Sequence, residues 1–251
     1  MKEYLNILGY KVSTKNVSMI VECAINSKDL IVVNTLNPHS YVESKQDKKF
    51  QKALTESDVI IPDGSGIVWA ARQLYRESIN KVAGSDLFFE TMNFLEQKQG
   101  SVFFLGSTNE VLEKIVVAAR VDFPRVQVHT FSPPYKKQFS KEDIEHFLIK
   151  VNEISPDVLF VGLTAPKQEK LILDMRNSLS VKMVSGIGAV FDFYAGTVKR
   201  PNDIWIKLHL EWLIRLIGEP KRLWRRTFIS APIFLLDVAK RKYNLIFYPK
   251  L

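Results

Sequence analysis

Short apolar runs alternate with longer amphipathic stretches along most of the chain. The apolar runs are continuous, which is typical of strands covered by helices on both faces. We predict strands at Leu30–Val33, Val59–Ile61, Val102–Leu105, Val126–His129, Val158–Val161 and Met183–Ser185. We predict helices at Tyr41–Leu54, Gly66–Arg76, Asp86–Gln99, Asn109–Asp122, Lys141–Glu153 and Pro166–Leu179. This alternation predicts an α/β fold with a mainly parallel sheet flanked by helices.

The pattern changes towards the C-terminus. From Ile204 to Arg226 apolar side chains recur at helical spacing, and Pro220 separates two predicted helices. The segment Trp205 to Leu251 holds ten Lys or Arg and three Asp or Glu, a balance of +7 out of +8 for the whole chain. We predict an α/β domain over 1–200 and a basic amphipathic helical appendage over 201–251. Such an appendage is expected to meet a lipid surface, a nucleic acid or substrate phosphates.

The composition is that of an ordinary globular protein, with 46% hydrophobic and 25% charged residues among 251. The single cysteine, Cys23, cannot form a disulfide within the chain and indicates a reducing compartment. We expect it to fill the core rather than act as a nucleophile. The N-terminus lacks a secretory pattern, and no run approaches the roughly 18 apolar residues of a membrane span. We expect a cytoplasmic protein that touches a membrane without crossing it.

Polar motifs directly follow predicted strands, where parallel sheets bind ligands. Thr35 and Asn37 carry hydrogen-bonding groups that suit sugar hydroxyls, although a turn with Ser40 capping the next helix accounts for the motif on its own. Asp63 stands between a strand and a glycine-rich turn, where a general base belongs. The alternative is that Asp63 only caps a helix or forms a turn.

Two further turns have the composition of phosphate-binding sites. Lys81 and Gly84 precede a predicted helix, whose first N–H groups can bind phosphate. Ser85 or Asp86 would equally serve as an N-cap there. Gly106 follows a strand in a small-residue turn that could cradle a nucleotide diphosphate.

Gln168 and Glu169 lie in the first turn of a predicted helix. They are candidate binding residues, and the alternative is capping, with Glu169 near the positive end of the helix dipole. Gly186–Asp192 resembles a dinucleotide fingerprint but has Phe191 at the third glycine position, which leaves a nicotinamide oxidoreductase as a weak alternative. The sequence contains no P-loop, no zinc-binding spacing and no Asp-x-Asp pair.

Taken together and in order, these motifs resemble the WecG/TagA/CpsF family of bacterial glycosyltransferases. The matching pieces are Asn34–Asn37, Asp63–Gly66, Gly84–Asp86, Phe104–Gly106, Val161–Leu163, Pro166–Glu169, Gly186–Ala189, Phe191–Phe193, Ala195–Gly196, Leu210–Leu213, Arg215–Leu216 and Glu219–Arg222. The chain departs from the family at Thr164, often Gly, at Lys81, often Arg, and at Lys199–Asn202, usually an Arg-Ala-Pro-like segment. These departures concern the donor sugar more than the reaction class.

The resemblance implies a Rossmann-like α/β fold with a membrane-associating helical appendage. It implies an inverting, metal-independent transferase without a cofactor. Such an enzyme moves a sugar from a UDP-sugar to an undecaprenyl-diphosphate-linked sugar at the cytoplasmic membrane face. The products are cell-surface polysaccharides or teichoic acids. The donors within the family include N-acetylmannosamine, its uronic acid and hexoses, and the shared motifs do not choose among them.

The resemblance also implies roles for individual residues. Asp63 would be the general base, Thr35 and Asn37 would line the acceptor pocket, and Gln168 would reach the site. Arginines of the appendage would complete it, and our placement of them is Arg215, Arg222 and Arg225. Inverting transfer needs a base and a group that stabilises the leaving diphosphate, and cations and helix N-termini can supply the second.

A different class of function stays open at this point. The chain could be a non-catalytic adaptor that binds a nucleotide or a membrane surface through its basic tail. We expect no nucleic-acid partner, whereas a homo-oligomer is possible because the amphipathic tail could pack on a neighbouring subunit instead of lipid.

Overall fold

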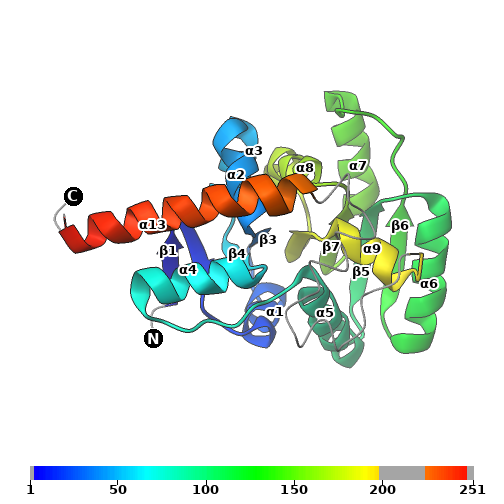
Figure 1. The fold of residues 1–251 in the computed structure, drawn as a ribbon. Coiled ribbons are helices and arrows are strands. Elements are labelled where there is room, and N and C mark those ends of the chain that lie inside the picture. Colours follow the sequence, from blue (N-terminus) through cyan, green and yellow to red (C-terminus); the bar gives the residue numbers. More distant parts are fainter. Residues whose placement is uncertain (1–2, 198–223, 248–251) are drawn as a thin grey trace.

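An eight-stranded sheet lies at the centre of the computed structural model, which describes residues 3–197 and 224–247 (Figure 1). The strand order is β1-β2-β4-β3-β8-β7-β5-β6, and every neighbouring pair is parallel except β1 with β2. The strands are β1 (Tyr4–Ile7), β2 (Tyr10–Ser13), β3 (Ile31–Leu36), β4 (Val59–Pro62), β5 (Ser101–Gly106), β6 (Gln127–Phe131), β7 (Val158–Gly162) and β8 (Met183–Gly186). The predicted α/β fold with a mainly parallel sheet is confirmed.

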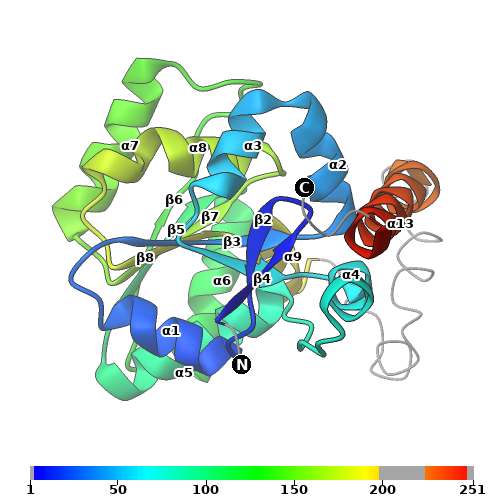
Figure 2. The same cartoon turned by 90° about the vertical axis from the view of Figure 1, so that its left-hand side faces the viewer.

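Helices cover both faces of the sheet (Figure 2). Helices α1, α5, α6 and α9 pack on one face, and α3, α7 and α8 on the other. The helices are α1 (Val17–Ile25), α2 (Pro38–Gln46), α3 (Lys48–Thr55), α4 (Ser65–Tyr75), α5 (Gly84–Lys98), α6 (Asn109–Asp122), α7 (Lys141–Ile154), α8 (Lys167–Met175), α9 (Gly188–Tyr194) and α13 (Ala231–Phe247), with a 3-10 turn η1 (Arg176–Ser178) and a π-helical turn η2 (Arg226–Ser230).

All six predicted strands are confirmed, and α6 has the predicted bounds. The single helix predicted over Tyr41–Leu54 is wrong, because the chain breaks at Asp47. This residue ends α2 in an extended conformation, and its carboxylate accepts the Phe50 N–H to cap α3. The helix predicted at Pro166–Leu179 begins at Lys167, and its last turn is 3-10. Cys23 is exposed on α1, so its predicted place in the core is also wrong.

Three features of the fold have no counterpart among the predicted ranges. The first is the hairpin of β1 and β2, whose turn has Leu8 and Gly9 at positive φ. The second is helix α1, and the third is α9, a short helix that begins at Gly188. The hairpin adds an antiparallel edge to an otherwise parallel sheet.

The direction in which the chain connects strands reverses between the neighbouring strands β5 and β7. From β5 the chain goes on to β6 at one edge of the sheet, and from β7 it goes on to β8, towards the other edge. The two strands end on the facing glycines Gly106 and Gly162, and a Cβ on Gly106 would lie 2.4 Å from the Gly162 carbonyl oxygen. Gly106 also has φ +133°, which side chains rarely adopt. Ligands of open α/β sheets bind at the carboxyl ends of strands beside such a switch.

The C-terminal helix α13 packs against α2 and α4 (Figure 2). Phe234 and Val238 are completely buried in a hydrophobic cluster shared with these two helices. The Phe234 ring meets Tyr41 edge-on at 5.4 Å between centroids, and Asp237 accepts hydrogen bonds from Tyr41 Oη (3.0 Å) and Lys45 Nζ (2.6 Å). The described part of the predicted appendage is therefore helical and fixed to the α/β body. Within the described ranges, no helix is long and apolar enough to cross a membrane.

Candidate active site

Asp63 and Asn37 lie side by side at the carboxyl ends of two paired strands. Strands β3 and β4 are in register at Leu36 and Pro62, so the residues that follow them meet. Asn37 Nδ2 donates to Asp63 Oδ2 at 3.2 Å, and the Asp63 N–H donates to the Leu36 carbonyl oxygen at 2.9 Å. Both side chains are half-buried, as is Thr35 earlier on β3. The structure thus brings Asn37 and Asp63 into contact, with Thr35 two residues before Asn37.

The helix caps show which residues of these motifs have a capping role. Asn37 itself caps α2, because its Oδ1 accepts the N–H groups of His39 and Ser40. The predicted cap, Ser40, instead occupies the third position of the capping box. Asp63 does not cap α4, since the capping position is Gly64 and no side chain bonds there. The Asp63 carboxylate is therefore held by an amide at a strand end, a place suited to a general base.

Gln168 lies at the carboxyl end of the neighbouring pair, β7 and β8. Its Oε1 accepts the Gly188 N–H at 3.1 Å, and its Nε2 donates to Glu169 Oε1 at 3.0 Å. Strands β4, β3, β8 and β7 are consecutive in the sheet. Asp63, Asn37, Gly188 and Gln168 therefore follow one another along a continuous stretch of its carboxyl edge.

Glu169 is buried behind Gln168, with 4% of its surface exposed. Burial raises the pKa of its carboxyl to about 7, and the Gln168 hydrogen bond and the charge of Lys170 offset this only in part. A buried carboxyl with a raised pKa at a strand-end site is a feature that functional sites share.

This raised pKa predicts a specific pH dependence of stability. The folded state favours the protonated acid, whereas the unfolded side chain ionises near its ordinary pKa of 4.5. The stabilisation is complete below that value and is lost as the pH rises through about 7. Between pH 5 and 8 the wild type should lose about 3 kcal/mol of unfolding free energy relative to Glu169→Gln, measured by urea titration. Parallel curves for the two proteins would contradict the assignment.

The start of α5 lies next to Asp63. The Val82 N–H donates to the Pro62 carbonyl oxygen at 3.0 Å, which ties the loop carrying the exposed Lys81 to the end of β4. Gly84 packs against Ile187, directly after β8. The predicted phosphate-binding segment therefore lies between the ends of β4 and β8.

Asp86 has a capping role at this helix. Its Oδ2 accepts the Ala83 N–H at 2.8 Å in a capping box. The prediction that this motif caps the helix is confirmed, but the residue at the capping position is Ala83 rather than Ser85 or Asp86. A ligand role for Asp86 stays a prediction.

The described part of the basic tail, which begins at residue 224, contacts helix α2, the helix that Asn37 caps. Arg225 Nη2 lies 3.2 Å from Glu43 Oε1 on α2, and His39 Nδ1 lies 2.9 Å from Ser230 Oγ. Burial lowers the pKa of His39; the charge of Glu43 opposes this shift, and the charges of Arg226 and Arg225 add to it. The other two predicted arginines, Arg215 and Arg222, lie outside the described residues.

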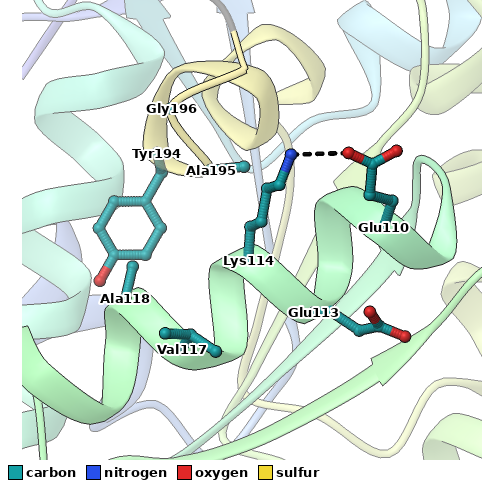
Figure 3. A pocket seen from close by; sticks show the side chains of 8 residues that line it. All are labelled: Glu110, Glu113, Lys114, Val117, Ala118, Tyr194, Ala195 and Gly196. Atoms are coloured by element: carbon teal, nitrogen blue, oxygen red, sulfur yellow. Dashed lines mark hydrogen bonds and ion pairs between the residues drawn. The ribbon is translucent and has the colours of Figure 1, made fainter.

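A surface groove of about 500 Å³ lies between α6 and α9 (Figure 3). Its lining residues are Glu110, Glu113, Lys114, Val117, Ala118, Tyr194, Ala195 and Gly196. They include none of the predicted site residues, and Lys114 is paired with Glu110 at 2.7 Å. The groove is separate from the strand-end site around Asp63.

Comparison with known proteins identifies the family. The model of the glycosyl transferase WecG/TagA/CpsF family matches residues 5–246. The chain belongs to this family. Membership of the WecG/TagA/CpsF family confirms the resemblance found in the sequence and makes the chain a glycosyltransferase. The nicotinamide alternative, which rested on an incomplete fingerprint, is left without support.

Several relatives are named N-acetylglucosaminyldiphosphoundecaprenol N-acetyl-beta-D-mannosaminyltransferase. The Bacillus spizizenii protein is 32% identical over 208 residues, covering 83% of this chain and 78% of its own length. The Bacillus subtilis protein is 31% identical over 90% of this chain and 86% of its own length. A Staphylococcus aureus protein is 28% identical over 96% of this chain and 94% of its own length. The family match over residues 5–246 spans both the strand-end motifs and most of the tail.

Proposed function

We propose that this glycosyltransferase moves a sugar from a UDP-sugar to N-acetylglucosamine linked to undecaprenyl diphosphate, with inversion and without a metal. The acceptor and an N-acetylmannosamine-type donor are suggested by the names of the relatives, and a hexose donor remains within the proposal. The observation that carries the proposal is the Asp63 carboxylate held by Asn37 at the carboxyl edge of the sheet.

In this mechanism Asp63 takes the proton from the acceptor hydroxyl. The hydroxyl oxygen attacks the anomeric carbon of the donor from the side opposite the UDP, and the bond to the UDP oxygen breaks. The carboxylate binds the proton, and the electron pair of the broken bond leaves on the diphosphate. Thr35, Asn37 and Gln168 would orient the acceptor.

The leaving diphosphate gains negative charge, which needs stabilisation in the absence of a metal. Three groups at the sheet edge can supply it. The first N–H groups of α5 and the turn at Gly106 offer backbone dipoles, and Lys81 offers a cation. We assign the appendage arginines Arg215, Arg222 and Arg225 to the same role. Because Arg225 pairs with Glu43 in this structure, its contact with phosphate requires that pair to open.

UDP release tests this proposal. Purified full-length protein is given a panel of UDP-sugars in EDTA, with and without a short-chain N-acetylglucosamine-diphosphate lipid. Release from one donor that depends on the acceptor supports the proposal. Absence of release with every donor, while calorimetry detects UDP binding, would overturn the proposed donor class and acceptor.

We also propose that the outer face of the tail docks on the anionic cytoplasmic surface of the membrane. Among its exposed side chains, Leu236, Ile246 and Phe247 each show about 60% of their surface, and α13 also carries the cations Lys240–Lys242. Apolar side chains flanked by cations suit an interface of anionic lipid, at about 1 kcal/mol per well-placed cation.

Replacing Leu236, Ile246 and Phe247 together with Ser should weaken binding to anionic vesicles about tenfold or more, because three apolar contacts are lost. Sedimentation with vesicles measures this. Val117→Ser on α6 is the matched control, since Val117 is equally exposed but far along the chain from the tail. Equal recovery of the triple variant and the wild type would refute the docking face.

A further inference from the structure

The Gln168 amide is fixed at both ends. Its oxygen accepts the Gly188 N–H and its nitrogen donates to Glu169 Oε1. The side chain lies directly on the end of β8, since a Cβ on Gly186 would come within 2.8 Å of Gln168 Nε2. Whatever fixes Glu169 therefore fixes Gln168 and the turn after β8.

The second oxygen of Glu169, Oε2, is buried without a hydrogen-bond partner among the described residues. No described cation pairs with this carboxyl, because Lys170 beside it is paired with Asp47, and Lys49 on the facing α3 with Asp174. An ionised carboxylate in this place would carry an uncompensated charge, which is costly in a protein interior. A protonated carboxyl would need only an acceptor for its O–H.

Asn34 carries an acceptor that lacks a partner in the described part of the chain. Its Nδ2 donates to Ser57 Oγ at 3.0 Å, and its Oδ1 is buried without a partner in the described part of the chain. Val32, two residues earlier on β3, packs in the cluster that includes Ile172 of α8. Because side chains alternate along a strand, Asn34 lies on the same face of the sheet as α8.

Among the described strands, one other buried oxygen lacks a partner, Ser185 Oγ, and it faces the other way. Met183, two residues before it on β8, belongs to the cluster on the opposite face of the sheet. Of the described strand residues, Asn34 is thus the one with an unpartnered acceptor on the side of Glu169.

We propose that Glu169 is a positioning residue: as a neutral carboxylic acid that donates to Asn34 Oδ1, it holds the Gln168 amide against the turn at Gly188. This inference rests on the proposed transferase function, in which Gln168 orients the acceptor. The elevated pKa of Glu169, about 7, agrees with a neutral acid in the folded protein.

Substitution by Gln tests the role, because an amide keeps both contacts without ionising. At about pH 6, Glu169→Gln should retain turnover within about twofold, whereas Glu169→Ala and Asn34→Leu should lower kcat about 10- to 100-fold through misplacement of Gln168. Glu153→Gln, on α7, is the control for loss of a carboxylate elsewhere. A folded Glu169→Gln variant as inactive as Glu169→Ala would show that the charged form is needed and would overturn the proposal. Full activity of Glu169→Ala would overturn it as well.

An infrared difference spectrum gives a second readout that needs no substrate. The wild type minus Glu169→Gln should show the carbonyl band of a protonated carboxyl at about pH 6, and the band should vanish as the pH rises through about 7. Absence of the band at about pH 6 would overturn the proposal. Because this spectrum is independent of turnover, it separates failure of the positioning role from failure of the proposed function.

Discussion

Asp63→Asn should lower turnover by about 10²- to 10⁴-fold, the contribution expected of a general base. The substitution removes the proton acceptor but keeps an oxygen that can accept from Asn37 Nδ2, now 3.2 Å away. Binding of UDP should therefore stay within about twofold of the wild type, because the base contacts the acceptor rather than the nucleotide. Steady-state kinetics and calorimetry on the same preparation measure the two effects.

Asp29→Asn is the matched control for this substitution. Asp29 is exposed two residues before β3, at the opposite end of the strand from Asn37, and its loss should leave kcat unchanged. If Asp63→Asn kept more than about a tenth of the wild-type turnover, another group would have to accept the proton.

Phe234→Ala should destabilise the docked tail by about 3–5 kcal/mol, because the ring is completely buried between α13, α2 and α4. Its removal opens a cavity beside Tyr41, which meets the ring edge-on. Since η2 joins this helix to His39, two residues after Asn37, a loosened helix should also lower transfer. Chemical denaturation and UDP release report the two consequences.

Leu236→Ala on the same helix serves as the control. Leu236 is 60% exposed, so its truncation should change stability by about 0.5 kcal/mol or less. Equal destabilisation by the two substitutions would mean that packing of Phe234 is not what attaches the tail to the α/β body.

The central strands were predictable because each is a continuous apolar run buried on both faces. The hairpin Tyr4–Ser13 escaped prediction since its two short strands alternate and turn through Leu8-Gly9, without the Asn-Gly signal of a tight hairpin. Asp47 could not be placed as a break by helical periodicity, which runs on through it. Local patterns thus identified the buried strands and missed the edge hairpin and the break between α2 and α3.

The strand-end site was predictable in outline, because the carboxyl ends of parallel strands share one edge. Asn37 shows why the alternative interpretations of a motif need not exclude each other. Its Oδ1 caps α2 while its Nδ2 holds Asp63. No sequence pattern predicted the contacts of the tail, because the residues in contact are far apart in the chain. His39 and Ser230 are 191 residues apart, and Tyr41 and Asp237 are 196 residues apart. Such pairs are set by tertiary packing, as is the burial of Glu169 and Asn34.

The product of the reaction tests the central claim most directly. Full-length protein is incubated with UDP-N-acetylmannosamine and a short-chain N-acetylglucosamine-diphosphate lipid in EDTA, and the lipid is analysed by mass spectrometry and by the anomeric coupling in its NMR spectrum. We predict that the wild type adds one N-acetylhexosamine residue with inverted anomeric configuration to the lipid, and that Asp63→Asn forms this product at most at about a hundredth of the wild-type rate. An unchanged lipid across the whole panel of UDP-sugars, or product that the Asp63→Asn variant forms at the wild-type rate, would contradict the account.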